Sequence, residues 1–61
     1  MKYNIGDIMY TKKAVQGIPE NTQVVIFDRR KKGSDTEIKI KDGKGTATGW
    51  VSKICVRKRR R

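Results

Sequence analysis

The stretch TEIKIKDGKGTATGWV, residues 36–51, decides the fold. Its first part alternates charged and apolar residues, which places Ile38 and Ile40 on one face of an extended chain and charged side chains on the other. Asp42-Gly43 follows as a tight-turn signal, and residues 46–51 have the composition of another strand. The stretch therefore predicts a half-buried strand, a turn and a further strand.

Two more strands are predicted before this stretch. Residues 24–27 form a continuous, largely β-branched apolar run, which is typical of a central strand covered on both faces. Nearer the start, Gly6 allows a bend into a strand that ends near Tyr10. Residues 11–22 contain the only proline, Pro19, and we expect them to form a long loop.

The remaining segments complete an all-β domain. Residues 29–34 are predicted to be a charged loop between strands, and Ile54-Cys55-Val56 is a last apolar piece after a turn at Ser52-Lys53. Residues 57–61 are five cations without an apolar partner, so we expect a disordered basic tail. No helix of ordinary length fits. Five short strands predict a small all-β barrel or sandwich over residues 1–56.

In this order the features resemble a Src-homology-3-like (SH3-like) barrel, most closely the bacterial members of that superfamily. The matching segments are the opening strand 6–10, the long loop 11–22, the second strand 24–27, the second loop 29–34, the hairpin turn 42–45 and the closing segment 49–56. The resemblance implies a five-stranded SH3-like barrel. It also implies that the closing segment is a strand, a one-turn helix and a final strand.

The resemblance does not imply a proline-rich peptide as the ligand. Members of the superfamily that bind such peptides use a tyrosine pair on the first loop, then a proline and a tyrosine near the end. Only Tyr10 matches one of these positions, and the other positions hold Lys12, Ser52 and Cys55.

The charge of the chain is high and unevenly distributed. Sixteen Lys and Arg residues against six Asp and Glu residues give a formal net charge of +10. Residues 1–28 hold three Lys and three acidic residues, so the whole excess lies in residues 29–61. Basicity this localised indicates a polyanionic partner, and nucleic acid is the commonest one. The alternative is charge that serves only solubility.

The residue types present disfavour catalysis. Without His and with one Cys, the chain has no internal disulfide, no closed zinc ligand set and no His-activated nucleophile. The acidic residues are spread singly, and no Gly-rich phosphate loop is present. We therefore predict a non-enzyme without metal or cofactor. Cys55 is either a thiol activated by neighbouring Lys53 and Arg57 or, as we favour, a small buried apolar residue.

The candidate nucleic-acid site combines basic residues with one aromatic ring. Cations of the second loop and the tail would neutralise phosphates, and strand cations would position the backbone. In an SH3-like barrel the second loop and the chain end can share one side, which would make the patch continuous. Trp50 either stacks on a base or packs, while Val51 enters the core. The predicted site residues are Arg29, Arg30, Lys31, Lys32, Lys39, Lys41, Trp50, Arg57, Lys58, Arg59, Arg60 and Arg61.

Two other functions stay open at this point. One is a protein-interaction module, encoded by a phage or mobile element, that binds and modulates a host protein through an acidic surface. The other is an extracellular wall-binding repeat. The start MKYNIGD lacks the apolar core of a secretory signal, and no run approaches the roughly 20 apolar residues of a membrane span. We therefore expect a cytoplasmic protein without a membrane partner, either a monomer or a weak homodimer joined through an open edge strand.

Overall fold

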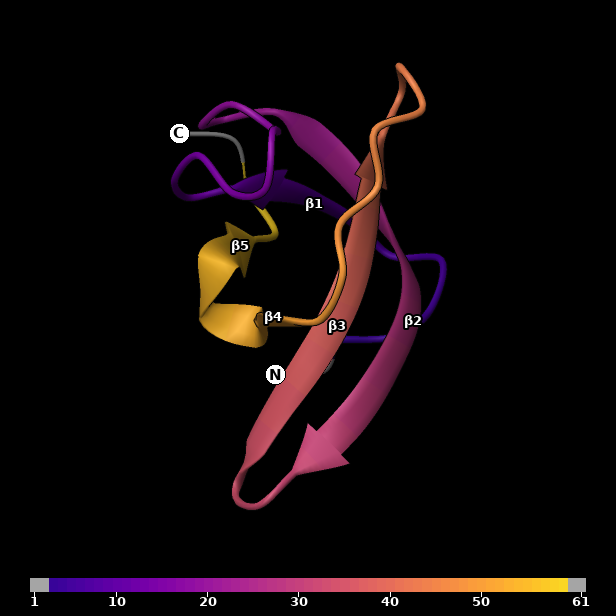
Figure 1. Ribbon diagram of the computed structural model, residues 1–61, viewed down its shortest axis with the longest axis vertical. Coiled ribbons are helices and arrows are strands. Elements are labelled where there is room, and N and C mark those ends of the chain that lie inside the picture. Colours follow the sequence, from indigo (N-terminus) through magenta and orange to yellow (C-terminus); the bar gives the residue numbers. More distant parts are fainter. Residues whose placement is uncertain (1–2, 60–61) are drawn as a thin grey trace.

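The fold is a five-stranded antiparallel β-sheet, given by a computed structural model that describes residues 3–59. The strands are β1 (Ile8–Thr11), β2 (Gln23–Lys32), β3 (Asp35–Asp42), β4 (Val51–Ser52) and β5 (Val56–Arg57). Their order in the sheet is β4-β3-β2-β1-β5, and each neighbouring pair is antiparallel. The sheet curves around one core but is not closed, because β4 and β5 form its two edges within the described residues (Figure 1). The all-β prediction is confirmed.

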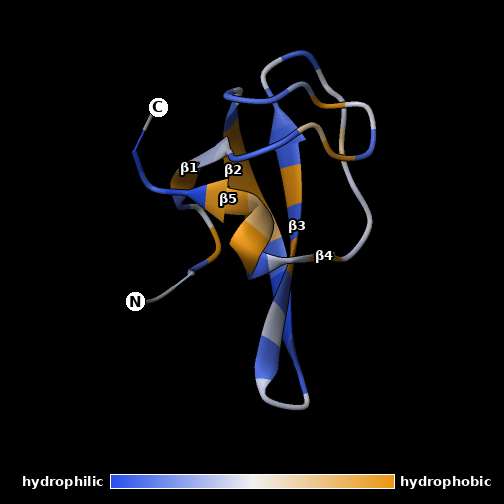
Figure 2. Cartoon of the chain, turned by 90° about the vertical axis from the view of Figure 1, so that its left-hand side faces the viewer, coloured by the Kyte–Doolittle hydropathy of each residue, from blue (hydrophilic) through white to orange (hydrophobic). Residues whose placement is uncertain are grey.

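The core lies on one face of the curved sheet. Its buried members come from all five strands, the long loop and the turn before β5, and they are Met9, Ile18, Val24, Ile26, Ile38, Ile40, Val51, Cys55 and Val56. Figure 2 shows this apolar material gathered in the body of the sheet. We call the side that bears Ile38 and Ile40 the core face and the opposite side the outer face. The prediction that these two isoleucines share a buried face is confirmed.

One prediction for β2 is wrong. Val24 and Ile26 are buried, but Val25 is half-buried and Phe27 is 37% exposed, so the strand is covered on one face only. The physical reason is that residues 3–59 form one sheet, and the buried apolar cluster of these residues packs on the core face of β2. A continuous apolar run does not reveal this difference, because all four residues have similar hydropathy.

A β-bulge explains the exposure of Phe27. The register of β2 against β3 shifts between Ile26 and Asp28, so Phe27 is an extra residue without its own partner. Ile26 pairs with Ile40, and Asp28 pairs with Lys39. An inserted residue bends its strand and redirects a side chain. Here it leaves the Phe27 ring within 6.0 Å of the Lys41 ammonium, whose side chain is exposed.

The expected charged loop at residues 29–34 is also wrong. β2 continues to Lys32, β3 starts at Asp35, and only Gly33 and Ser34 turn the chain. Gly33 has φ of 61°, a conformation that glycine adopts without strain. The charged residues form a strand because their side chains lie in water and the backbone ladder with β3 satisfies their polar groups. The resulting hairpin projects past the core, at the bottom of Figure 1.

Side-chain hydrogen bonds shape the segment after β3. The Asp42-Gly43 turn is confirmed, and the Asp42 carboxylate accepts hydrogen bonds from the Lys44 and Thr46 amides at 2.9 and 2.8 Å. The strand expected over residues 46–51 is reduced to a single bridge, between Lys41 and Ala47, and the short β4. Elsewhere in this segment the Ile40 amide donates a hydrogen bond to the Thr48 hydroxyl at 3.1 Å, where a regular sheet would supply a backbone carbonyl.

The long loop is held by buried Thr11. Its hydroxyl donates to the Pro19 carbonyl at 2.7 Å and accepts from the Thr22 amide at 2.9 Å. Ile18, at the far side of the loop, is fully buried. The loop predicted for residues 11–22 is therefore confirmed from residue 12 onward, because Thr11 is the last residue of β1.

The closing segment follows the order that the resemblance implied. β4 leads into a one-turn 3₁₀ helix, η1 (Lys53–Cys55), whose start is capped by the Ser52 hydroxyl. The strand β5 follows at once and pairs with β1. Arg57 belongs to β5 and pairs with Tyr10, so it is a strand residue rather than the first residue of a disordered tail. Of the remaining tail, Arg60 and Arg61 lie outside the described residues.

Candidate nucleic-acid interface

The β2–β3 hairpin distributes the predicted cations over two faces. Residues paired across an antiparallel ladder point to the same side, and successive residues alternate. Arg29 pairs with buried Ile38 and so belongs to the core face, whereas Arg30 pairs with Glu37 on the outer face. The same alternation sends Lys31 to the core face and Lys32 to the outer face. The four consecutive cations are therefore not one patch.

Arg29 anchors the start of the chain. One nitrogen of its guanidinium, Nη1, donates to the Tyr3 carbonyl at 2.9 Å and to the Asn4 side-chain oxygen at 3.1 Å. Tyr3 is half-buried against the core. Both acceptors are neutral, so these contacts orient the Arg29 charge without cancelling it.

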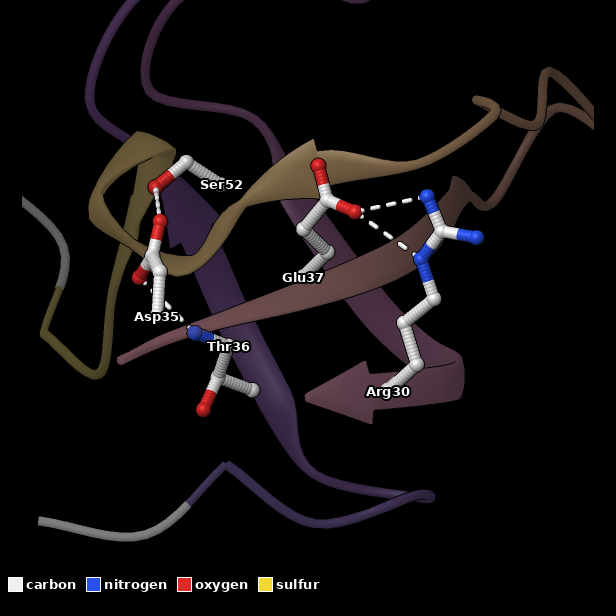
Figure 3. Close-up of polar contacts among 5 residues, drawn as sticks. All are labelled: Arg30, Asp35, Thr36, Glu37 and Ser52. Atoms are coloured by element: carbon white, nitrogen blue, oxygen red, sulfur yellow. Dashed lines mark hydrogen bonds and ion pairs between the residues drawn. The ribbon is translucent and has the colours of Figure 1, made fainter. Parts of the chain in front are cut away.

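Trp50 contacts two cations of its own chain. The Arg30 guanidinium carbon lies 4.4 Å from the centroid of the indole ring, and the Lys39 ammonium lies 4.9 Å from it. Arg30 also pairs with the Glu37 carboxylate, at 2.8 Å from Nε and 2.7 Å from Nη2 (Figure 3). A base that stacks on this half-buried ring therefore competes with two cations already in contact with it. The indole ring therefore connects β2 and β3 through its contacts with these two cations. Val51, the next residue, lies in the core as predicted.

The acidic residues of the hairpin are held by other partners. Glu37 faces Arg30, and Asp35 accepts hydrogen bonds from the Ser52 hydroxyl at 3.2 Å and the Thr36 amide at 2.8 Å (Figure 3). Within residues 3–59 the Arg30–Glu37 contact is the one ion pair. The other ammonium groups of the hairpin make no ion pair within residues 3–59, although Lys32 faces Asp35 and Lys39 faces Asp28 across the ladder. These groups are those of Lys31, Lys32, Lys39 and Lys41.

A second part of the outer face is apolar. Ile8, Val25 and Lys41 lie in one row across β1, β2 and β3, because Val25 pairs with both of the others. Ile8 is 50% exposed and the Phe27 ring lies beside the row. These three residues of the row also line a surface hollow of about 180 Å³. Sequence reasoning missed Ile8, Val25 and Phe27 because it placed the last two in a strand covered on both faces.

The tail does not join the hairpin cations. Arg57 lies beside Tyr10, which pairs with Gln23 at the start of β2, whereas Lys32 lies at the other end of that strand. Lys32 is nine positions after Gln23 along the strand, about 30 Å at roughly 3.3 Å per residue. Lys58 and Arg59 are exposed, and the chain leaves β5 away from the hairpin tip in both Figure 1 and Figure 2. The patch is therefore not continuous from hairpin to tail.

Cys55 packs in the core. It is 7% exposed and lies in η1 among the buried apolar residues, as favoured from the sequence. The helical content of residues 3–59 is this single short turn, so nothing in that range is a helix long and apolar enough to cross a membrane.

Comparisons with known proteins found no matching family model, no similar curated protein and no similar solved structure. The class of the protein is therefore defined by its geometry. It is a small, open, five-stranded antiparallel β domain with a projecting basic hairpin and a mixed apolar and basic outer face.

Proposed function

We propose that this chain is a small cytoplasmic protein of the SH3-like class that binds nucleic acid without enzymatic activity. Binding is mainly to backbone phosphates and has low sequence specificity. Three features support the SH3-like class: the long loop after β1, the 3₁₀ turn after β4, and the short final strand that pairs with β1.

The proposal depends mainly on the hairpin lysines, which make no ion pair within residues 3–59. Lys31 and Lys32 are exposed at the projecting end of the hairpin, and the nearby carboxylates of Asp35 and Glu37 are held by Ser52 and Arg30. Each phosphate that a free ammonium group neutralises releases condensed counterions, which makes binding favourable and salt-dependent. Lys39 and Lys41 share the outer face with Lys32, while Lys31 lies on the core-face side. The basic tail, residues 57–61, supplies a separate contact.

Low sequence specificity follows from the kind of cation. Lysine presents a flexible point charge, whereas a free guanidinium presents its donors in a planar, fixed fork that discriminates base edges better. Both hairpin arginines already make contacts within the chain, Arg29 with Tyr3 and Asn4, and Arg30 with Glu37. We therefore assign the hairpin to phosphate contacts, which position a nucleic acid without reading its sequence.

A matched pair of double variants tests this function. Lys31→Ser with Lys32→Ser removes two free cations from the hairpin, and Lys12→Ser with Lys13→Ser removes two exposed cations from the long loop. We expect the hairpin variant to bind a labelled oligonucleotide on the order of tenfold more weakly, with a salt slope about 1.5 smaller. The loop variant changes affinity much less. Equal losses would mean that only net charge matters, and no loss in the hairpin variant would reject the hairpin as the phosphate site.

A further inference from the structure

The outer face near the bulge combines an exposed aromatic ring, an apolar floor and flanking ammonium groups. The bulge leaves the Phe27 ring 37% exposed, and the Lys41 ammonium lies 6.0 Å from its centroid. Ile8 and Val25 form the adjoining apolar surface, since they face each other across β1 and β2. Lys39, one position along the outer face of β3, adds a second cation next to the bulge.

The surface hollow that shares Lys41 with this ring has room for a flat group. Its volume is about 180 Å³, and Val25, Ile8 and Lys41 are among the residues that line it. An apolar cavity of about 150 Å³ holds one benzene ring. Gly43 also lines the hollow and contributes no side chain that would fill it.

We propose that Phe27, with the floor formed by Ile8 and Val25 and the flanking Lys41, is the site where an unpaired base of single-stranded nucleic acid stacks. The inference rests on the proposed function and names its preferred substrate. Proteins that bind single strands place bases on aromatic rings and track the phosphates with cations. The Phe27 site has both components, with one cation over the ring at 6.0 Å, whereas two cations lie closer to the Trp50 ring, at 4.4 and 4.9 Å.

A single strand fits this site better than a duplex. In a duplex each base is stacked between its neighbours, so its flat face is not accessible to a side chain unless the helix is opened. A splayed single strand presents bases and phosphates together. Asp28 lies opposite Lys39 and Asp42 lies at the end of β3, but the Asp42 carboxylate is held by two backbone amides. These amide hydrogen bonds orient the Asp42 carboxylate without cancelling its charge. Lys41 is therefore the cation at the Phe27 ring that would contact the phosphate next to the stacked base, while the Lys39 ammonium lies 4.9 Å from the Trp50 centroid.

The test compares Phe27→Ala and Phe27→Tyr in the full chain. The probes are a fluorescein-labelled oligothymidylate of about twelve nucleotides, which exceeds the length of the domain, and its duplex with oligoadenylate. We expect Phe27→Ala to bind the single strand about tenfold more weakly, the loss typical of one stacked base, and to bind the duplex within about twofold of the natural chain. Phe27→Tyr keeps the ring and keeps single-strand affinity. Ile54→Ala, which shortens a 64% exposed side chain on η1, is the control.

The outcomes separate this inference from the proposed function. If the natural chain binds the single strand but Phe27→Ala binds it equally well, the stacking site is overturned and the phosphate-binding function stands. If the natural chain binds neither probe at low salt, both are overturned and a protein partner takes precedence. Ultraviolet cross-linking of the natural chain to the oligothymidylate provides a readout that needs no variant. A cross-linked peptide carrying Phe27 supports the site, and cross-linking confined to the Trp50 peptide overturns it.

Discussion

Trp50 links two strands through its ring rather than through the core alone. Arg30 comes from β2 and Lys39 from β3, and both cations contact the indole, while Glu37 holds Arg30 from the side. A cation over an aromatic ring contributes about 0.5–1 kcal/mol at exposed sites, and the half-buried indole adds apolar contact. Trp50→Ala should therefore lower the free energy of unfolding by about 2 kcal/mol, measured by urea denaturation.

A conservative variant distinguishes the contribution of an aromatic face at position 50 from that of the full size of the indole. Trp50→Phe keeps an aromatic face at the same position, so we expect it to retain about half of the stability that Trp50→Ala loses. If Trp50→Ala unfolds at the same urea concentration as the natural chain, the contacts with Arg30 and Lys39 do not stabilise the hairpin.

At the scale of elements, the projecting end of the hairpin depends on its two-residue turn. Gly33 has φ of 61°, where a β-branched side chain is strained, whereas asparagine tolerates this conformation. Gly33→Val should cost about 1–3 kcal/mol locally and speed amide hydrogen exchange at Lys31 and Lys32. Exchange at Ile26 and Ile40 should stay unchanged, because the core lies elsewhere on the strands. Gly33→Asn is the control, and equal exchange at Lys31 in all three chains would contradict a turn-dependent hairpin.

How far the sequence predicts an element depends on whether its residues alternate in hydropathy. β3 is predictable because Ile38 and Ile40 alternate with charged residues, whereas the last apolar piece, Ile54-Cys55-Val56, contributes only Val56 to the final strand. Residues 29–32 are all charged, so their hydropathy does not reveal that their side chains alternate between the two faces. They form a strand because they pair with β3. The bulge at Phe27 is invisible for the opposite reason, because residues 24–27 are all apolar.

The same limit applies to the candidate site. Charge alone identifies Lys31, Lys32, Lys39 and Lys41 as candidates, since that inference needs only composition. Their division between two faces needs the register of β2 against β3. The contacts that occupy the Trp50 ring come from side chains on two different strands, and no spacing along the chain encodes them.

For the whole molecule, the two basic regions lie at opposite ends of a domain 29 Å long. At about 3.4 Å per nucleotide, the spacing of one strand in a duplex, about nine stacked nucleotides reach from one end to the other, and a splayed strand needs fewer. Lys58→Ser with Arg59→Ser should therefore weaken binding to a single strand of about 20 nucleotides several-fold, while leaving binding to a strand of about three nucleotides within twofold. Fluorescence anisotropy with both lengths measures this. A loss that is equal for the two lengths would contradict separate contacts at the two ends.

The central claim is that free cations of this domain bind backbone phosphates, and the salt dependence of binding tests it most directly. The measurement is the affinity of the full natural chain for a labelled single strand between about 50 and 200 mM salt. With four free hairpin lysines and the tail, we expect the logarithm of the affinity to fall linearly with the logarithm of the salt concentration, with a slope of about −3 to −5. A slope near zero, or no binding at the lowest salt, would contradict the account.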